Sequence, residues 1–465
     1  MISTNSLSMT DAQYQRMYQH LFPGDGLEAA AVLVCSRVPQ PRLRLLVKDV
    51  VLVPYDECTV RERDQIVWPG GAIEEAIDLA EEDGLSLVLV HSHPGGLFAF
   101  SAQDDRSDRA VIPGIFQSHG SMHGSGIVTP DGAMLARVYR RDMSSEVLDV
   151  VSVAGDDIRW WWRDRRFMQR PLAFTSETRE ELSRLVACVV GVSGTGSLVA
   201  EQLARLGFGR VQLIDFDHVE ARNLNRIINA TRSDAANARM KVDVFADAIA
   251  GHRGDHVAVP LASSINDRSA VLLASQADVM FCCVDTVEAR YICDLIAATF
   301  LMPLFDVGVA IPTRRLGETV AIADVCGRVD YVQPGGCSLQ DRGVYSPETL
   351  RAEYLSRVSP ASHQEEMRAG YLKGVIEQTP SVITLNMRAA SACVMEFIAR
   401  VYPFRHTPNS HHARTAFSLA DAEDESFAEA SFPCTVNRNL ARGDREPLLG
   451  LPALRYKAAE VDRAA

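Results

Sequence analysis

Short apolar runs that end at polar residues recur along the chain, and they predict buried β-strands. The strands predicted in this way cover residues 29–35, 85–90, 186–190, 211–214 and 278–284. In the second half these runs alternate with stretches of helical pattern, such as the one that ends at Leu206. Because alternating strands and helices are typical of a doubly wound parallel sheet, we expect an α/β fold.

The densest group of reactive side chains follows the apolar run 85–90. His91 and His93 come directly after it in a His-x-His-Pro motif, and Ser101 and Asp104 follow within the next eleven residues. Side chains alternate along a strand, so the two imidazoles are expected to point the same way. A carboxylate from the next helix then completes a three-ligand zinc site that keeps a fourth position for water. Zinc lowers the pKa of such a water toward neutrality, which is what a hydrolase needs.

This spacing resembles that of the JAMM (JAB/MPN) metallopeptidases. The resemblance implies zinc held by His91, His93 and Asp104, with Ser101 as a donor to the tetrahedral oxyanion. It also implies an upstream Glu as general base, and Glu28 is the first candidate because it precedes the apolar run 29–35. Glu57, in a turn-like context, ranks second. The alternatives are a pair of core histidines, or a fold of this type that has lost its metal.

A glycine-rich loop follows the predicted strand 186–190. Gly191, Gly194 and Gly196 form G-x-x-G-x-G, in front of a helical pattern. Backbone N–H groups and the helix dipole both face an anion at such a loop, so it can cradle phosphate. The dinucleotide pattern is G-x-G-x-x-G, which makes an NAD- or FAD-binding domain the less favoured interpretation.

Polar residues further along the chain complete a second pattern, made of Asp215, Asn223, Arg226, Lys241 and Asp285. Together with the glycine loop, this series resembles the ThiF/MoeB adenylyltransferases and the adenylation domains of ubiquitin-activating enzymes, from about residue 166 to residue 405. Taken singly, Asp215 and Asp285 could be strand-end caps, and Arg226 and Lys241 could be solvated surface charges.

The resemblance implies specific roles for these residues. Asp215 would accept hydrogen bonds from the ribose hydroxyls of ATP, and Asp285 would bind Mg²⁺. Asn223, Arg226 and Lys241 would hold the phosphates as pyrophosphate leaves. The nucleophile would be the C-terminal carboxylate of a ubiquitin-like or sulfur-carrier protein, and the product an acyl-adenylate. The family's dimerisation implies a homodimer.

Cysteine usage favours reduced thiols. The ten cysteines are scattered, mostly within apolar runs, and a disulfide framework is not expected in so long a chain. Many ThiF-like domains carry a structural zinc between two C-x-x-C pairs. In this chain, Gln340 and Asn437 stand where the second Cys of each pair would be, three residues after Cys337 and Cys434. We therefore predict no structural zinc in this half. Both cysteines are candidates for a catalytic thioester, although a structural thiol is the favoured interpretation of each.

Composition narrows the classes of partner. The formal charge of -13 argues against a general nucleic-acid binder, and no apolar stretch reaches the length needed to span a membrane. The N-terminus lacks a signal peptide's charged and apolar regions, so a cytoplasmic location is expected.

We therefore predict two catalytic domains. A JAMM-type α/β metallopeptidase domain at 1–150 is followed by a linker at 151–178, a Rossmann-like doubly wound ThiF-type domain at 179–405 and a C-terminal tail at 406–465. The Trp triplet 160–162 in the linker is interpreted as a packing plug between the domains.

The predicted function is a bifunctional enzyme of a bacterial ubiquitin-like system. It would process or remove a ubiquitin-like protein with zinc and adenylate its C-terminal glycine with ATP and Mg²⁺; where targets are modified, a conjugating enzyme would be a further partner. The alternatives are activation of a sulfur carrier in cofactor or siderophore-like biosynthesis, and a scaffold with a degenerate activating domain.

Overall fold

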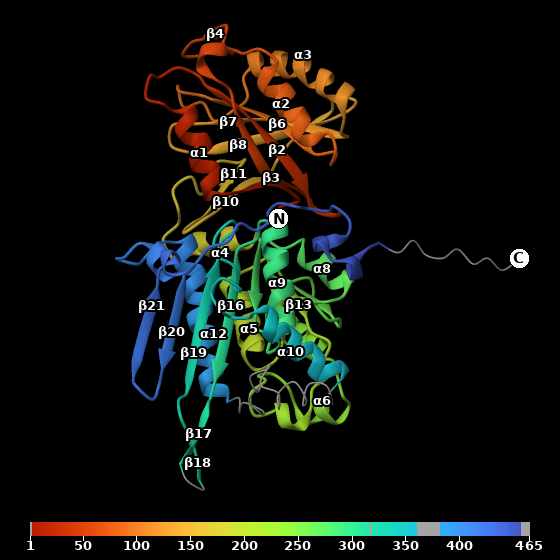
Figure 1. Cartoon of the computed structure of the whole chain (residues 1–465), viewed down its shortest axis with the longest axis vertical. Coiled ribbons are helices and arrows are strands. Elements are labelled where there is room, and N and C mark those ends of the chain that lie inside the picture. The colour runs from red at the N-terminus through yellow and green to blue at the C-terminus, as the bar shows by residue number, and fades with distance from the viewer. Residues whose placement is uncertain (1, 317–318, 360–381, 457–465) are drawn as a thin grey trace, which may run out of the picture. The chain divides into compact units, whose positions relative to one another are not determined.

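The computed structural model describes residues 2–316, 319–359 and 382–456 (Figure 1). The chain divides into two compact units. The first unit comprises residues 3–170, 298–301 and the chain from 438 onward. The second unit comprises residues 171–297 and 302–437 together with the N-terminal residues that precede Ser3.

A nine-stranded mixed sheet forms the first unit, in the order β11-β10-β1-β3-β2-β6-β7-β8-β9. Its strands are β1 (Asn5–Thr10), β2 (Ala30–Arg37), β3 (Leu43–Leu52), β6 (Ser86–Ser92), β7 (Met122–Val128), β8 (Met134–Arg140), β9 (Ser145–Val147), β10 (Val150–Ala154) and β11 (Ile158–Trp162). The short strands β4 (Val60–Arg61) and β5 (Ile66–Val67) form a separate pair. The strands predicted at 29–35 and 85–90 are confirmed as β2 and β6.

Side-chain alternation in these strands builds a core on each face of the sheet. Leu33 and Val88 join one buried cluster with residues of α1 (Asp11–Leu21). Val32 and Leu87, their neighbours along the strands, join the other cluster with residues of α2 (Gly71–Ala80) and α3 (Ala102–Ser118). The period of two therefore sends alternate residues to opposite faces, and both faces are covered by helices.

The predicted linker differs from the structure. Residues 150–154 and 158–162 are the antiparallel pair β10 and β11, and β10 also pairs in parallel with β1. The three Trp side chains lie on β11 and are buried, and the Trp161 ring packs at a tilt against Tyr14 with a centroid distance of 5.1 Å. Trp161 belongs to the core cluster of the first unit, and all three Trp lie on a strand of its sheet. The interpretation of the triplet as a plug between domains stays a prediction.

The second unit is a doubly wound sheet with an antiparallel extension, in the order β14-β13-β12-β15-β16-β19-β20-β21. Its strands are β12 (Val186–Val190), β13 (Arg210–Ile214), β14 (Ala258–Leu261), β15 (Val279–Cys282), β16 (Leu304–Ala310), β19 (Cys326–Val332), β20 (Arg414–Ser418) and β21 (Glu423–Phe427). The first five are parallel and the last three are antiparallel, while β17 (Thr313–Leu316) and β18 (Thr319–Ile322) form a hairpin. The strands predicted at 186–190, 211–214 and 278–284 are confirmed.

The helices of the second unit are α4 (Ser176–Leu182), α5 (Gly194–Leu206), α6 (Arg232–Ala236), α7 (Lys241–Arg253), α8 (Arg268–Ala274), α9 (Val287–Thr299), α10 (Pro347–Val358) and α12 (Ile383–Val401). Because β13 and β15 lie on opposite sides of β12, the strand order reverses at β12. Ligands of doubly wound sheets bind at the carboxyl edge beside such a switch point.

The predicted tail at 406–465 is only partly a tail. Strands β20 and β21, drawn in blue in Figure 1, extend the second unit's sheet beside β19. Glu423, Asp424 and Glu425 lie on β21 and are exposed there. Residues 438–456 pack with the first unit. Across the described residues, no helix combines the length and apolar character needed to cross a bilayer.

The position of Trp161 generates a test of this fold. Trp161→Ala should destabilise the first unit by about 3–5 kcal/mol, because it empties a buried site against Tyr14. Denaturant unfolding followed by circular dichroism measures this. Leu172→Ala is the matched control from the same predicted linker, where Leu172 is 79% exposed, and should change stability by less than about 0.5 kcal/mol. Equal, small effects of both variants would contradict the assignment of β11 to the core.

Candidate active sites

The two predicted zinc-ligand histidines lie at the carboxyl end of β6. His91 pairs with Ala30 of β2 and with Ile127 of β7, and His93 follows just beyond the strand. Their Nε2 atoms are 3.0 Å apart. The strand neighbours therefore fix both imidazoles, and the rings converge as the alternation predicts.

Asp104 joins them from the first turn of α3. Its Oδ1 lies 3.2 Å from His91 Nε2, and its Oδ2 lies 3.5 Å from His93 Nε2. The helix begins with a capping box, in which Ser101 Oγ accepts from Asp104 N at 3.2 Å and Asp104 Oδ2 accepts from Ser101 N at 2.5 Å. The cap turns the carboxylate back toward the loop that carries His93. One ligand atom from each of the three side chains lies within 4.8 Å of the other two.

Burial and the two histidines shift the pKa of Asp104 in opposite directions. Burial alone would raise the pKa of Asp104, but hydrogen bonds from His91 and His93 hold that pKa well below its usual range. Burial lowers the pKa of His93, and the bond to Asp104 reverses the shift, so the net direction is upward. Asp104 is thus an anionic hydrogen-bond acceptor between the two imidazoles.

Glu28 lies at the same end of β2. Ala30 pairs with His91 and the backbone of Ala29 bonds Ser92, so continuing this register places Glu28 opposite His93. Glu28 is 7% exposed, and burial raises its pKa to about 7; His93 lowers that pKa and Asp104 raises it. A carboxyl group poised near neutrality can take and release protons at physiological pH. Glu57, the second candidate, is exposed in a 3₁₀ turn.

The donor set fits zinc. Two imidazole nitrogens and one carboxylate oxygen are the three protein ligands of many catalytic zinc sites. His93 Nδ1 lies 2.7 Å from the carbonyl oxygen of Leu97, which can only accept, so Nδ1 carries a proton. The other ring nitrogen, Nε2, faces Asp104 and is the one that would bind a metal in place of its proton.

In the second unit, the glycine loop lies between β12 and α5 at the switch point. Gly191 has φ +85°, and a Cβ there would lie 2.9 Å from the carbonyl oxygen of Cys283. Val192 N donates to Asp215 Oδ2 at 2.7 Å, which ties the loop to the end of β13. Gly194 and Gly196 begin α5, so the loop does open a helix as predicted.

The other predicted nucleotide residues surround this loop. Burial raises the pKa of Asp215, and the charge of Lys241 opposes that shift. Lys241, buried at the start of α7, bonds Asp217 Oδ2 at 2.7 Å. The Arg226 side chain packs against the loop, because its Cδ would lie 3.2 Å from a Cβ added at Gly194.

Asn223 and Asp285 complete the set. Asn223 is buried, and its Oδ1 accepts from Glu220 N at 3.0 Å. Asp285 follows β15, is exposed, and lines a cavity of about 640 Å³. Because β13 and β15 flank β12, Asp215 and Asp285 come from the same carboxyl edge of the sheet, on either side of the glycine loop.

Buried charges beside this cavity were not predicted from the sequence. Asp306 on β16 is fully buried and bonds Arg290 at 2.6 Å and Arg328 at 2.9 Å, and both arginines line the cavity. A single Asp within an apolar strand was the only sequence signal. Its partners come from other elements, so spacing could not identify them.

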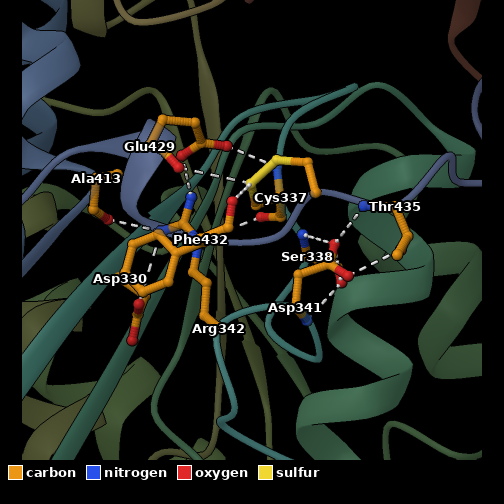
Figure 2. Close-up of a disulfide and its surroundings, with 10 residues drawn as sticks. Asp330, Cys337, Ser338, Asp341, Arg342, Ala413, Glu429, Phe432 and Thr435 are labelled. Atoms are coloured by element: carbon orange, nitrogen blue, oxygen red, sulfur yellow. Dashed lines mark hydrogen bonds and ion pairs between the residues drawn. A yellow bond between two sulfur atoms is a disulfide. The ribbon is translucent and has the colours of Figure 1, made fainter.

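The two thioester candidates are joined to each other. Cys337 and Cys434 form a disulfide with a Cα–Cα distance of 4.5 Å, across a sequence separation of 97 residues (Figure 2). The expectation that these two cysteines are unpaired thiols is therefore wrong in this structure. The return of the chain after β21 brings them together, since Glu429 accepts from Cys337 N at 2.6 Å and bonds the buried Arg342 at 2.5 Å.

The disulfide also bears on the chemistry of this cluster. Cys337, Cys434 and Glu429 have the spacing of a metal-binding group. Two sulfurs bonded to each other offer no thiolate, and neither can attack an acyl-adenylate. The remaining eight cysteines are free.

The class of protein follows from these two units and is borne out by comparison with known proteins. A profile of prokaryotic homologs of the JAB domain matches residues 10–143, and the profile of the ThiF family matches residues 167–421. The second match covers more than half of the chain. The chain belongs to the ThiF family, and it carries a JAB-type domain fused at its N-terminus.

Individual relatives resemble only part of the chain. Ubiquitin-like modifier-activating enzyme 5 of Oryza sativa subsp. japonica is 29% identical over 181 residues, which cover 36% of this chain and 39% of that protein. A tRNA threonylcarbamoyladenosine dehydratase of Bacillus subtilis (strain 168) is 40% identical over 85 residues, covering 18% and 33%. Among solved structures, Escherichia coli MccB with succinimide aligns with a TM-score of 0.42 at 16% identity, covering 56% of this chain and 69% of that one. The chain thus spans less than two fifths of the length of these two sequence relatives.

The disulfide generates a test of this part of the structure. Under denaturing conditions without reductant, the protein should show eight reactive thiols, and ten after reduction. Reduction should also lower the stability of the second unit by about 2–4 kcal/mol, because it releases a long closed loop in the unfolded chain. Thiol titration and thermal unfolding measure these effects. A Cys58→Ser variant should lose one thiol and keep the response to reductant. Ten thiols without reductant would contradict the pairing.

Proposed function

We propose that this chain is a bifunctional enzyme of a ubiquitin-like protein system. The first unit would be a zinc peptidase that trims or removes a ubiquitin-like protein. The second unit would adenylate the C-terminal glycine of that protein with ATP and Mg²⁺. The homodimer and the conjugating enzyme that the family resemblance implies belong to this proposal.

One observation carries the proposal. A single chain combines three side chains that could hold a metal ion, with a buried carboxyl group whose pKa is raised to about 7 beside them, and a domain of the ThiF family. Families of both kinds act on the same feature of a substrate, the extended C-terminal tail of a ubiquitin-like fold. The name of the Oryza sativa relative, a ubiquitin-like modifier-activating enzyme, is consistent with that substrate.

The peptidase mechanism assigns a task to each side chain. His91, His93 and Asp104 would hold zinc, which when bound supplies an acidic water and polarises the scissile carbonyl. The Glu28 carboxylate would take the proton of the attacking water and pass it to the leaving amine. The hydroxyl of Ser101 would donate to the developing oxyanion, because the bond it accepts from Asp104 N leaves its own proton available.

In the proposed adenylation mechanism, positively charged and N–H groups would face the ATP phosphates. The backbone N–H groups at the start of α5 would bind phosphate oxygens, and Asp215 would accept from the ribose hydroxyls. Arg226, which packs against the glycine loop, and Lys241 would stabilise the charge of the departing pyrophosphate. Asn223 would bind phosphate beside them. Asp285 would hold Mg²⁺ in the cavity that it lines.

Two alternatives concern the fate of the adenylate. In a sulfur-carrier pathway the adenylate would receive sulfur and no target protein would be modified. In the thioester alternative, Cys337 or Cys434 would attack it, which requires their disulfide to be reduced first. A hydroxylamine-labile conjugate that forms under reducing conditions and is lost in a Cys337→Ala variant would support transfer to that thiol.

A third alternative is a scaffold whose activating domain is degenerate. ATP–pyrophosphate exchange distinguishes this case, with a small β-grasp carrier protein as the substrate to be adenylated. Exchange that depends on the carrier supports activation. Exchange with transfer RNA, the substrate class in the name of the Bacillus subtilis relative, would overturn the assignment of a protein carrier. No exchange with either would leave the scaffold.

Glu28 is the residue whose removal tests the peptidase half. Glu28→Ala should abolish cleavage of a carrier precursor, with a loss of about 10²–10⁴-fold, while zinc stays bound, because Glu28 moves protons and is not a metal ligand. Cleavage assays together with metal analysis check this. Glu57→Ala is the matched control at an exposed Glu and should keep full activity. Retained cleavage in the Glu28 variant would remove Glu28 from this role.

Asp285 tests the adenylation half. Asp285→Ala should reduce carrier-dependent ATP–pyrophosphate exchange by about 100-fold or more without changing peptidase activity, because the proposed Mg²⁺ neutralises phosphate charge. Asp255→Ala, at another exposed Asp of the second unit, serves as the control. Loss of both activities in the Asp285 variant would point to misfolding or to coupled sites, and unchanged exchange would contradict the assignment.

A further inference from the structure

A buried arginine lies behind the metal centre and takes no part in the mechanism above. Arg137 is on β8, with a side chain only 8% exposed. It bonds Asp108 through Nη2 at 2.7 Å and through Nε at 3.1 Å, and it bonds Asp105 through Nη1 at 2.6 Å. Its guanidinium also lies 3.9 Å from the centroid of the Phe100 ring.

These contacts bracket the ligand Asp104 along the chain. Phe100 lies four residues before Asp104, Asp105 directly follows it, and Asp108 lies four residues after it on the next turn of α3. One guanidinium therefore grips the helix start on both sides of the ligand.

The arginine itself belongs to the block of strands that carries the histidines. On β8, Arg137 pairs with Ser125 of β7, and Ser125 pairs with Leu89 of β6. Leu89 lies two residues before His91 on the same strand. The sheet thus fixes His91 directly and, through Arg137, fixes the helix turn that supplies the third ligand.

Asp108 is the other half of this clamp. It is 6% exposed, and Ser125 and Tyr139 also donate to its Oδ2. A buried carboxylate with this many donors keeps one position, since each hydrogen bond restricts it. The second turn of α3 is therefore anchored to β7 and β8.

The clamp answers a mechanical need of the site. Residues 93–101 connect β6 to α3 without regular secondary structure, and Asp104 is in the first turn of the helix. The ends of helices fray, and an irregular connection does not by itself fix the separation of a carboxylate from two imidazoles. Partners outside the ligand set commonly orient metal ligands, and losing one typically weakens metal binding by about 10–100-fold.

We propose that Arg137 is a positioning residue for the metal centre. It holds the Asp104 turn of α3 against the strands that carry the histidines, so that zinc meets a preformed set of ligands. This inference rests on the proposed zinc peptidase function.

The geometry of arginine makes a sharp test possible. Arg137→Lys keeps the charge, so the electrostatic field at the metal is preserved, but a single ammonium cannot bond Asp105 and Asp108 as the guanidinium fork does. In the full-length chain, zinc affinity measured by competition with a chromophoric chelator should fall about tenfold or more. The visible absorption of the Co²⁺-loaded protein should change as well, which a role in stability alone would not produce. Unfolding of the metal-free protein shows whether the variant is folded.

A second pair of variants keeps the proposal falsifiable if Arg137→Lys does not fold. Asp105→Ala removes the clamp contact nearest the ligand, and Asp105 has a side chain that is 46% exposed, so folding should be retained. Asp64→Ala is its matched control, because Asp64 is exposed and acts electrostatically on Glu28. The Asp105 variant should lose about tenfold in zinc affinity and the Asp64 variant less than twofold.

The outcomes separate this inference from the proposed function. Native zinc affinity, to within twofold, in folded Arg137→Lys or in Asp105→Ala would overturn the positioning role and leave the peptidase proposal standing. Equal losses in Asp105→Ala and Asp64→Ala would also overturn it, because charge alone would then explain the effect. A native chain that binds no zinc would overturn both.

Discussion

The contact between the Asp104 carboxylate and the imidazoles of His91 and His93 is the interaction on which the first unit's chemistry depends. A buried carboxylate needs partners, and here its partners are two rings at the end of one strand. The surrounding elements hold these three side chains in place. The neighbours β2 and β7 hold β6, the capping box turns Asp104 toward the rings, and the carbonyl of Leu97 accepts a hydrogen bond from Nδ1 of His93.

In the second unit, buried carboxylates are paired with arginines. Asp306 and Asp330 are fully buried on the adjacent antiparallel strands β16 and β19, and both bond Arg328. Arg342 continues this network from Asp330 to Glu429 beside the disulfide (Figure 2). Removing one partner of such a buried pair leaves an uncompensated charge, so these groups fix the edge of the cavity that Asp285 lines.

Much of this arrangement could be predicted from the sequence, because it depends on local pattern. The apolar runs gave β2, β6, β12, β13 and β15, and the spacing of His91, His93 and Asp104 placed three side chains that the structure brings together. Glycine spacing placed a loop at the start of α5. In each case the residues lie within one strand, one turn or one strand–loop–helix unit, where a few residues determine the geometry.

The features that were missed depend on partners distant in sequence. Hydrophobic periodicity does not show which strand will pair with a Trp-rich segment. In the structure this segment is β11, the edge strand of the sheet, which pairs with β10, and β10 pairs with β1. Cys337 and Cys434 are far apart in the sequence, and the path of the chain through β20 and β21 brings them together. In the sequence Arg137 is one polar residue of a strand, and nothing near it in the chain identifies its partners on α3. The short, polar strand β21 has exposed side chains and so lacks the alternation that marks a half-buried strand.

The central claim is that zinc binds to His91, His93 and Asp104. X-ray absorption at the zinc edge of the native chain, loaded with one equivalent of zinc, tests this most directly. Binding to these three side chains should give a coordination sphere of nitrogen and oxygen at about 2.0–2.2 Å that includes imidazole. Sulfur at about 2.3 Å would instead place the metal at Cys337 and Cys434, and that result, or a chain that retains no zinc, would contradict zinc binding at His91, His93 and Asp104.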